Sequence, residues 1–301
     1  MQSEIRNPKS ATRNSISANT ELPIGIFDSG VGGLTVYRAL HERLPDEHFV
    51  YLGDTARVPY GTKSLTTVER YAVENARFLE AHGIKLLVVA CNTASALALP
   101  AIRRAVNVQV IGVIEPGAQA AVVAANKQPV AVIATEATVQ SGAYSQAIHK
   151  LDPAIEVIER ACPLFVPLAE EGWANSEVAA SVAEHYLAEF KNFKTAAMVL
   201  GCTHYPILQD VIRKTMTPDV KLIDSGEATA RQVEQLLKKM DLSRSSTRSE
   251  EVEREMCDDL DHFYVTDAAQ RFANVAERFL GVAPSVLEAV EIWGHDELRT
   301  Q

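Results

Sequence analysis

The sequence has no excess of positive charge and no uncharged apolar run long enough to cross a membrane. Its 301 residues include 29 Lys and Arg against 39 Asp and Glu, which gives a formal net charge of -10. Proteins that bind nucleic acids normally carry basic clusters, so nucleic acid is not expected as a primary partner. The longest apolar stretch, 86–102, contains polar residues and a proline and is short for a membrane span. Residues 1–22 lack the apolar core of a signal peptide. We therefore expect a cytoplasmic protein that does not enter a membrane.

Cysteine is scarce, and no two cysteines form a C-x-x-C pair. The four positions are Cys91, Cys162, Cys202 and Cys257. In a chain of this length without an export signal, free thiols are expected rather than disulfides. Zinc and redox motifs have no support in this spacing, and we expect no metal. The sequence also has no Walker A run and no complete G-x-G-x-x-G motif, and we expect no cofactor.

Short apolar runs alternate with helical patterns along most of the chain. The runs at 24–27, 49–52, 85–90, 108–114, 130–134, 155–158, 196–200, 220–223 and 262–265 are typical of buried strands. Helical patterns cover 34–44, 66–82 and 268–280. Repeated β-α-β units with continuous apolar strands predict an α/β fold with parallel sheets covered on both faces.

Ligands of such sheets bind at the carboxyl ends of the strands, so the residues that follow each strand are the candidates for a site. Two of these segments resemble each other, because Cys91-Asn92-Thr93 and Cys202-Thr203-His204 each follow an apolar strand that ends in a small residue. Asp28-Ser29-Gly30 and Asp224-Ser225-Gly226 form a second similar pair. The sequence therefore predicts two related α/β domains that face each other, each presenting one cysteine.

A lone cysteine is usually a small buried apolar residue, and we interpret Cys162 and Cys257 in this way. Cys91 and Cys202 each precede a predicted helix start, where the helix N-terminus lowers a thiol pKa. One cysteine with a histidine favours nucleophilic catalysis, so a Cys-His hydrolase stays an alternative. Two cysteines in mirrored positions instead favour a base on one side of a carbon atom and an acid on the other. A carbanion formed at a chiral carbon can be reprotonated on either face, so the pattern predicts racemisation.

Three further features have two interpretations each. Asp28 is either a helix cap or a carboxylate that orients a substrate ammonium group or accepts a proton near one thiol. His204 is either structural or holds the proton balance of the second thiol near neutral pH. Gly30, Gly32 and Gly33 form either a phosphate-type loop or a tight strand-to-helix turn.

Four segments in this order resemble the glutamate racemase family: 27–34 (FDSGVGGL), 59–61 (PYG), 90–95 (ACNTAS) and 201–206 (GCTHYP). The resemblance covers about residues 23–281. It implies cofactor-independent interconversion of L- and D-glutamate, which supplies D-glutamate for peptidoglycan and so for cell wall biogenesis and cell shape. It implies that Cys91 and Cys202 are the two bases, with Asp28 assisting near the first and His204 near the second. The resemblance also implies an auxiliary carboxylate before the second cysteine, for which Glu170 is favoured over the adjacent Glu171. The implied substrate contacts are Ser29, Tyr60, Gly61, Asn92, Thr93, Thr135, Thr138 and Thr203.

The family fold implied by the resemblance is two flavodoxin-like, three-layer domains related by a pseudo-two-fold, with the active site in the cleft between them. We expect residues 1–22 to be a flexible extension, 23–116 plus 227–301 the first domain, and 117–226 the second. Residues 241–261 are expected to be an acidic exposed connection. A homodimer with glutamate as its small-molecule partner is also implied. The alternatives are an aspartate racemase, which shares the two-cysteine plan, and a non-catalytic amino-acid binding protein.

Overall fold

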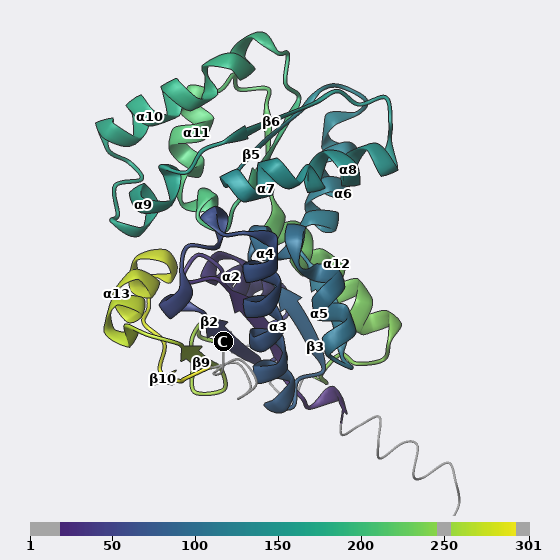
Figure 1. Cartoon of the computed structure of the whole chain (residues 1–301), viewed down its shortest axis with the longest axis vertical. Coiled ribbons are helices and arrows are strands. Elements are labelled where there is room, and N and C mark those ends of the chain that lie inside the picture. The colour runs from purple at the N-terminus through teal and green to yellow at the C-terminus, as the bar shows by residue number, and fades with distance from the viewer. Residues whose placement is uncertain (1–18, 246–253, 293–301) are drawn as a thin grey trace, which may run out of the picture.

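A computed structural model describes residues 19–245 and 254–292 and contains two parallel β-sheets. The first sheet has six strands in the order β10-β9-β2-β1-β3-β4, and the second has four in the order β6-β5-β7-β8. Figure 1 shows the two lobes that these sheets form, with the four-stranded sheet in the upper lobe. The predicted fold class, two α/β domains with parallel sheets, is confirmed.

The six-stranded sheet combines strands from the two ends of the described chain. They are β1 (Ile24–Asp28), β2 (Phe49–Gly53), β3 (Leu86–Val89), β4 (Gln109–Gly112), β9 (His262–Val265) and β10 (Leu287–Ala289). Its helices are α2 (Leu34–Arg43), α3 (Leu65–Ala81), α4 (Asn92–Leu97), α5 (Leu99–Ala105), α12 (Ser225–Lys239) and α13 (Ala269–Leu280). Successive strand residues point to opposite faces. Thus Ile24 and Ile26 pack in one apolar cluster with α2 and α12, while Phe27 packs in another with α3 and α5.

The four-stranded sheet consists of β5 (Val130–Ala134), β6 (Val157–Ala161), β7 (Ala197–Gly201) and β8 (Lys221–Asp224). Its helices are α6 (Ile114–Ala125), α7 (Glu136–Ser141), α8 (Ala143–Leu151), α9 (Phe165–Glu170), α10 (Glu177–Leu187) and α11 (Gln209–Thr215). Short 3₁₀ turns, η1 (Thr55–Arg57), η2 (Tyr60–Thr62), η3 (Ala188–Asn192) and η4 (Tyr205–Leu208), connect elements of both domains. The chain enters this domain through α6 and leaves it through α12, and these two helices contact each other.

Four strands follow the same order in the two sheets, β2-β1-β3-β4 in the first and β6-β5-β7-β8 in the second. The strand order therefore reverses at equivalent points. In the first sheet that point lies between β1 and β3, and in the second between β5 and β7. Ligands of parallel α/β sheets bind at such switch points, beyond the carboxyl ends of the strands. Cys91 follows β3 and Cys202 follows β7, so each domain presents its cysteine at this position.

The strands and helices predicted from sequence are present, with two differences. The sixth strand was expected at 155–158 but runs from Val157 to Ala161, and β10 was not predicted. Helices predicted at 34–44, 66–82 and 268–280 correspond to α2, α3 and α13.

The expected exposure of 241–261 is wrong for three residues. Arg254, Cys257 and Asp261 are buried, and Arg254 forms an ion pair of 2.6 Å with the carboxylate of Asp261. The carboxylate of Asp261 also accepts hydrogen bonds from Tyr37 and from the backbone of Phe49, so charged residues of this segment are part of the first domain. Residues 246–253 lie outside the described residues.

Residues 19–22 contact the first domain. Lys85 Nζ donates to the carbonyl of Thr20 at 2.8 Å, and Glu21 pairs with Arg244. Positions 1–18 of the expected flexible extension lie outside the described residues.

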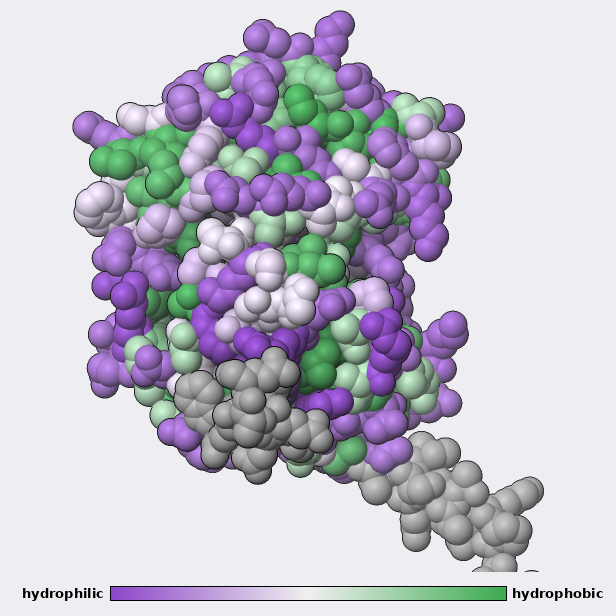
Figure 2. Space-filling model, in the orientation of Figure 1, coloured by the Kyte–Doolittle hydropathy of each residue, from purple (hydrophilic) through white to green (hydrophobic). Residues whose placement is uncertain are grey.

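The surface is mixed in character. On the face in Figure 2, hydrophilic residues cover most of both lobes and apolar residues are scattered among them. Within residues 19–245 and 254–292, no helix has both the length and the apolar character needed to cross a membrane.

Candidate active site

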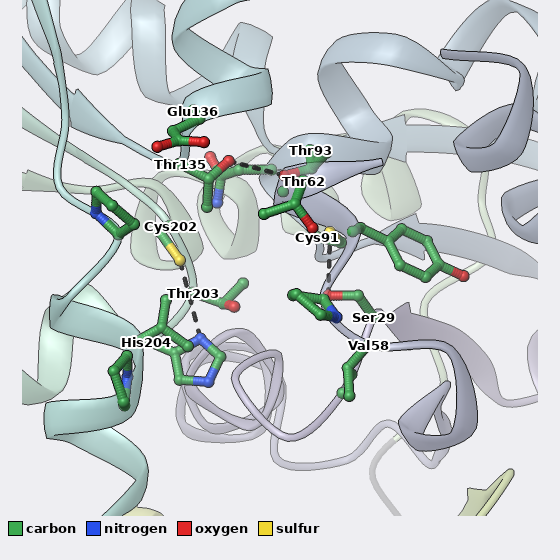
Figure 3. Close-up of a pocket in the computed structure, with 18 of the residues that line it drawn as sticks. Ser29, Val58, Thr62, Cys91, Thr93, Thr135, Glu136, Cys202, Thr203 and His204 are labelled. Carbon is green, nitrogen blue, oxygen red and sulfur yellow. Dashed lines mark hydrogen bonds between the residues drawn. The ribbon is translucent and has the colours of Figure 1, made fainter. Parts of the chain in front are cut away.

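A cleft of about 220 Å³ lies between the two domains, and residues of both domains line it. Pockets for drug-sized ligands measure roughly 300–1,000 Å³, so this cleft suits a smaller molecule such as an amino acid. Figure 3 shows Cys91 and Cys202 approaching it from opposite walls. The first domain contributes Ser29, Gly30, Val58, Pro59, Tyr60, Gly61, Thr62, Cys91, Asn92 and Thr93, and the second Thr135, Glu136, Pro163, Val166, Pro167, Glu170, Cys202, Thr203 and His204.

Cys91 occupies the N-cap position of α4, directly beyond β3. The backbone N–H of Ala94 donates to its Sγ at 3.5 Å, and the thiol donates to Ser29 Oγ at 3.5 Å. Burial, together with the nearby carboxylate of Asp28, raises the pKa of Cys91 to about 12. The expectation that the helix start would lower this pKa is wrong, because the loss of hydration outweighs the N–H donor. Cys91 is therefore a protonated thiol in the unliganded cleft at neutral pH.

Cys202 has a different neighbour. Nδ1 of His204 lies 3.8 Å from its Sγ, and Nε2 of the same ring lies 3.0 Å from Oε1 of Glu170 on α9. Although burial lowers the pKa of His204, its hydrogen bonds to Cys202 and Glu170 raise it to about 10. The hydrogen bond from His204 in turn lowers the pKa of Glu170. An imidazolium is thus placed to hold or supply a proton at Cys202.

Asp28 lies at the end of β1, behind the wall of the cleft, and does not line it. Its Oδ2 accepts the N–H of Gly30 at 2.9 Å, and Thr203 Oγ1 donates to Oδ1 at 3.5 Å. Burial raises its pKa above the usual range, against the lowering effect of His204. The alternative of a cap for the next helix does not hold, because α2 has Gly33 at its N-cap and no side-chain cap. Asp28 thus contacts Thr203, which lines the cleft, and the backbone next to Ser29. Through these contacts it can influence both residues although it does not line the cleft itself.

The glycines after β1 serve a close approach between domains. A Cβ atom at Gly32 would lie 2.3 Å from Thr203 Oγ1 and 2.4 Å from His204 Nδ1, and one at Gly33 would lie 2.4 Å from Cβ of Asp28. Only a residue without a side chain lets this loop touch the loop that carries Cys202 and His204. This close approach gives Gly32 and Gly33 a packing role in the turn between β1 and α2.

Hydroxyl and amide groups form the polar wall between the thiols. Thr93 Oγ1 lies 3.0 Å from Thr135 Oγ1, which joins the two domains across the cleft. Thr138 lies behind this pair, 2.9 Å from Thr135 Oγ1, and does not line the cleft. Gly61 also crosses the domain boundary, since a Cβ there would lie 2.9 Å from Cβ of Thr135.

The tyrosine expected to contact the substrate is held by a buried carboxylate. The Tyr60 hydroxyl hydrogen-bonds to Asp54 Oδ2, and Asn75 Nδ2 donates to the same hydroxyl at 3.0 Å. Thr266 and Arg57 donate to Asp54 as well. The polar end of Tyr60 is therefore occupied, and the residue contributes its ring to the cleft.

Eleven of the thirteen expected site residues line the cleft, and the other two, Asp28 and Thr138, lie behind its walls. Sequence reasoning did not find Val58, Pro59, Thr62, Glu136, Pro163, Val166 and Pro167 as lining residues. Thr62 and Glu136 adjoin residues that were found. Pro163 follows β6, whose end was expected three residues too early.

Neutral donors outnumber cations among the lining residues. Among the described residues that line the cleft, none is Lys or Arg, and the cationic group is the imidazolium of His204 on the Cys202 side. Hydroxyl, amide and backbone N–H groups are the other partners available to a carboxylate. The described residues also contain no group of three or more His, Cys, Asp or Glu side chains arranged to hold a metal ion.

The fold and the site agree with one family. The model of the Asp/Glu/Hydantoin racemase family matches residues 24–233, and the chain belongs to this family. A glutamate racemase of Geobacter metallireducens is 50% identical over 258 residues, which are 86% of this chain and 92% of the relative.

Two solved structures are similar along most of their length. The glutamate racemase of Francisella tularensis, solved in complex with D-glutamate, superposes with a TM-score of 0.81 at 40% identity and covers 91% of this chain and 98% of its own. The glutamate racemase isoform RacE1 of Bacillus anthracis gives a TM-score of 0.84 at 34% identity, with the same coverage.

Proposed function

We propose that this chain interconverts L- and D-glutamate by a two-base mechanism without a cofactor. The observation that carries the proposal is the pair Cys91 and Cys202, which line one cleft from two domains and lie on opposite walls. Racemisation needs a base on one side of the α-carbon and an acid on the other. The similarity to glutamate racemases supports glutamate as the substrate.

In the direction that starts from Cys202, the imidazolium of His204 compensates the negative charge of the Cys202 thiolate. This thiolate then removes the α-proton and becomes a thiol. The thiol of Cys91, which burial keeps protonated, then gives its proton to the opposite face of the carbanion. One proton leaves the substrate and one enters the product, so the sulfurs exchange their protonation states. The reverse direction uses Cys91 as the base and Cys202 as the acid.

The polar wall binds and orients the substrate in this proposal. The groups assigned to contact it are Ser29, Tyr60, Gly61, Asn92, Thr93, Thr135 and Thr203. Thr138 supports Thr93 and Thr135 from behind, at 3.3 and 2.9 Å. Neutral donors fixed in a buried cleft stabilise the charge that builds up on the carboxylate as the α-carbon loses its proton. Asp28 and Glu170 act near the first and second thiol respectively.

Two alternatives are separated by simple experiments. An aspartate racemase would act on L-aspartate and leave L-glutamate unchanged. A binding protein would bind an amino acid and catalyse no exchange of its α-proton.

The test is circular dichroism of L-glutamate in D₂O with the purified protein and no added cofactor, with L-aspartate in parallel. We expect the glutamate signal to decay to zero, deuterium to appear at the α-carbon of the D-product, and the remaining L-glutamate to stay largely protiated early on. Deuterium appearing equally in both enantiomers from the start would contradict two separate bases. Activity on aspartate alone would identify the chain as an aspartate racemase.

We propose further that the enzyme acts in the cytoplasm as a homodimer and supplies D-glutamate for peptidoglycan. These assignments follow from the family resemblance. Light scattering on the purified chain tests the dimer, and rescue of a D-glutamate auxotroph by its expression tests the cellular role. A monomer with full activity would remove the dimer from the proposal.

A further inference from the structure

One buried hydrogen bond joins the domains at the edge of the cleft. Tyr144, on α8 of the four-stranded domain, donates its hydroxyl to Oδ1 of Asn92, on α4 of the six-stranded domain, at 2.7 Å. Tyr144 is fully buried and Asn92 is 3% exposed. Water therefore does not compete with this bond, which is the condition under which a hydrogen bond constrains geometry most.

The bond uses the oxygen end of the Asn92 amide and leaves its nitrogen end free. Nδ2 of Asn92 is buried and has no hydrogen-bond partner in the part of the chain that the structure describes. Buried polar groups are nearly always paired, and an exception needs an explanation. Because Asn92 lines the cleft, a ligand is the partner that this N–H₂ group lacks. Two N–H donors suit a carboxylate oxygen.

The phenol of Tyr144 is itself held in place from three sides. Ser225, the first residue of α12, lies beside its hydroxyl and donates its own proton to the carbonyl of Leu200 at 3.4 Å. A Cβ atom at Gly117 on α6 would lie 3.2 Å from its ring, and one at Gly201 at the end of β7 would lie 3.0 Å from it. Both glycines thus leave room for the ring. The hydroxyl of Tyr144 directs its own proton to Oδ1 of Asn92.

We propose that Tyr144 is a positioning residue that fixes the Asn92 amide with Nδ2 facing the substrate carboxylate. The inference rests on the proposed function, in which Asn92 contacts the substrate. Without the hydroxyl, the amide is free to rotate by half a turn, and its oxygen then faces the carboxylate with a repulsive partial charge. Tyr144 touches the substrate only through Asn92 in this arrangement.

The first test is Tyr144→Phe, which removes the hydroxyl and keeps the ring. We expect KM for glutamate to rise roughly tenfold, the size of one lost hydrogen bond to a charged group, with a smaller change in kcat. The matched control is Tyr37→Phe. Tyr37 is equally buried, and its hydroxyl hydrogen-bonds to Asp261 and to the backbone of Cys257, away from the cleft. This control should lower Tm at least as much and leave KM unchanged.

The second test is a double-mutant cycle with Asn92→Ala, followed by kcat/KM and, for slow variants, by calorimetric titration with DL-glutamate. If Tyr144 acts through Asn92, Tyr144→Phe has no further effect once Asn92 is alanine. Additive losses, an unchanged KM in Tyr144→Phe, or an equal rise of KM in Tyr37→Phe would each overturn the inference. Asn92→Ala with wild-type KM would instead remove Asn92 from the substrate site, which is a failure of the proposed function and is distinguishable from the others.

Discussion

Nε2 of His204 lies 3.0 Å from Oε1 of Glu170, and both side chains stand on the Cys202 side of the cleft. Within the described residues, the hydrogen bonds of Cys91 join it instead to Ser29 Oγ and to the backbone N–H of Ala94. The two thiols therefore have unequal surroundings although the strands that present them occupy equivalent places. In the unliganded cleft, burial raises the pKa of the Cys91 thiol, whereas Cys202 lies beside an imidazole whose pKa is raised to about 10.

Glu170→Gln removes a charge that raises the pKa of His204, so that pKa should fall. The imidazolium is then lost at lower pH, and the alkaline limb of the kcat/KM profile should move to lower pH. We expect kcat near neutral pH to change little and kcat at alkaline pH to fall, because a decrease of about one unit from a pKa of about 10 leaves His204 protonated at neutral pH. NMR titration of the His204 ring and a pH–rate profile measure both effects.

Glu171→Gln is the matched control, because Glu171 is adjacent in sequence and is exposed, and among the described ion pairs it contacts only Arg271. It should leave the His204 pKa and the pH profile unchanged. Equal shifts in the two variants would show that overall charge, rather than the hydrogen bond to His204, sets the titration.

Cys91→Ser and Cys202→Ser should each reduce racemisation by at least about 10²-fold, because a hydroxyl exchanges protons poorly with a carbon acid at neutral pH. The readout is kcat in both directions. Cys257→Ala is the control, since Cys257 is buried in the first domain and does not line the cleft. Near wild-type turnover in either serine variant would contradict the two-base mechanism.

The sequence pattern was sufficient to predict the parallel sheets and the cysteine-bearing segments. Continuous apolar strands and the residues that follow them are local features of the sequence. The switch points follow from the order of the strands in each sheet. The pairing of His204 with Cys202 could be proposed because the two residues are only two positions apart. Glu170 was expected as an auxiliary carboxylate only through the family resemblance, and its contact with His204, 34 residues later, was not predicted.

Contacts between domains could not be predicted from local pattern. Thr93 with Thr135, Tyr144 with Asn92, and the approach of Gly32 to His204 all depend on how the two domains are packed. The pKa of Cys91 was misjudged for a related reason, because its burial by both domains outweighs the local helix start. The buried ion pair of Arg254 and Asp261 was missed because a charge-rich composition favours exposure.

Gly32→Ala should disturb the Cys202 side of the cleft. The added Cβ would lie 2.4 Å from His204 Nδ1, so the imidazole or the whole loop must move. We expect kcat/KM to fall by at least about tenfold, since catalytic geometry tolerates little displacement. Gly281→Ala is the control, because it is strained by its φ of +79° but meets no atom within 4 Å. That variant should lose roughly 1–2 kcal/mol of stability and keep its activity, and a fully active Gly32→Ala enzyme would argue against the close approach.

Asp28→Asn should lower kcat more than it raises KM, because Asp28 lies behind the cleft wall and its expected role is in proton transfer. The amide oxygen can still accept the N–H of Gly30, so the loop keeps its turn. Asp224→Asn is the control, since Asp224 accepts the N–H of Gly226 at 2.7 Å in the equivalent segment of the second domain and asparagine serves equally well as a helix cap. Steady-state kinetics in both directions separate kcat from KM. A change confined to KM would make Asp28 a binding residue, and equal losses in the two variants would assign its effect to the turn rather than to the carboxylate.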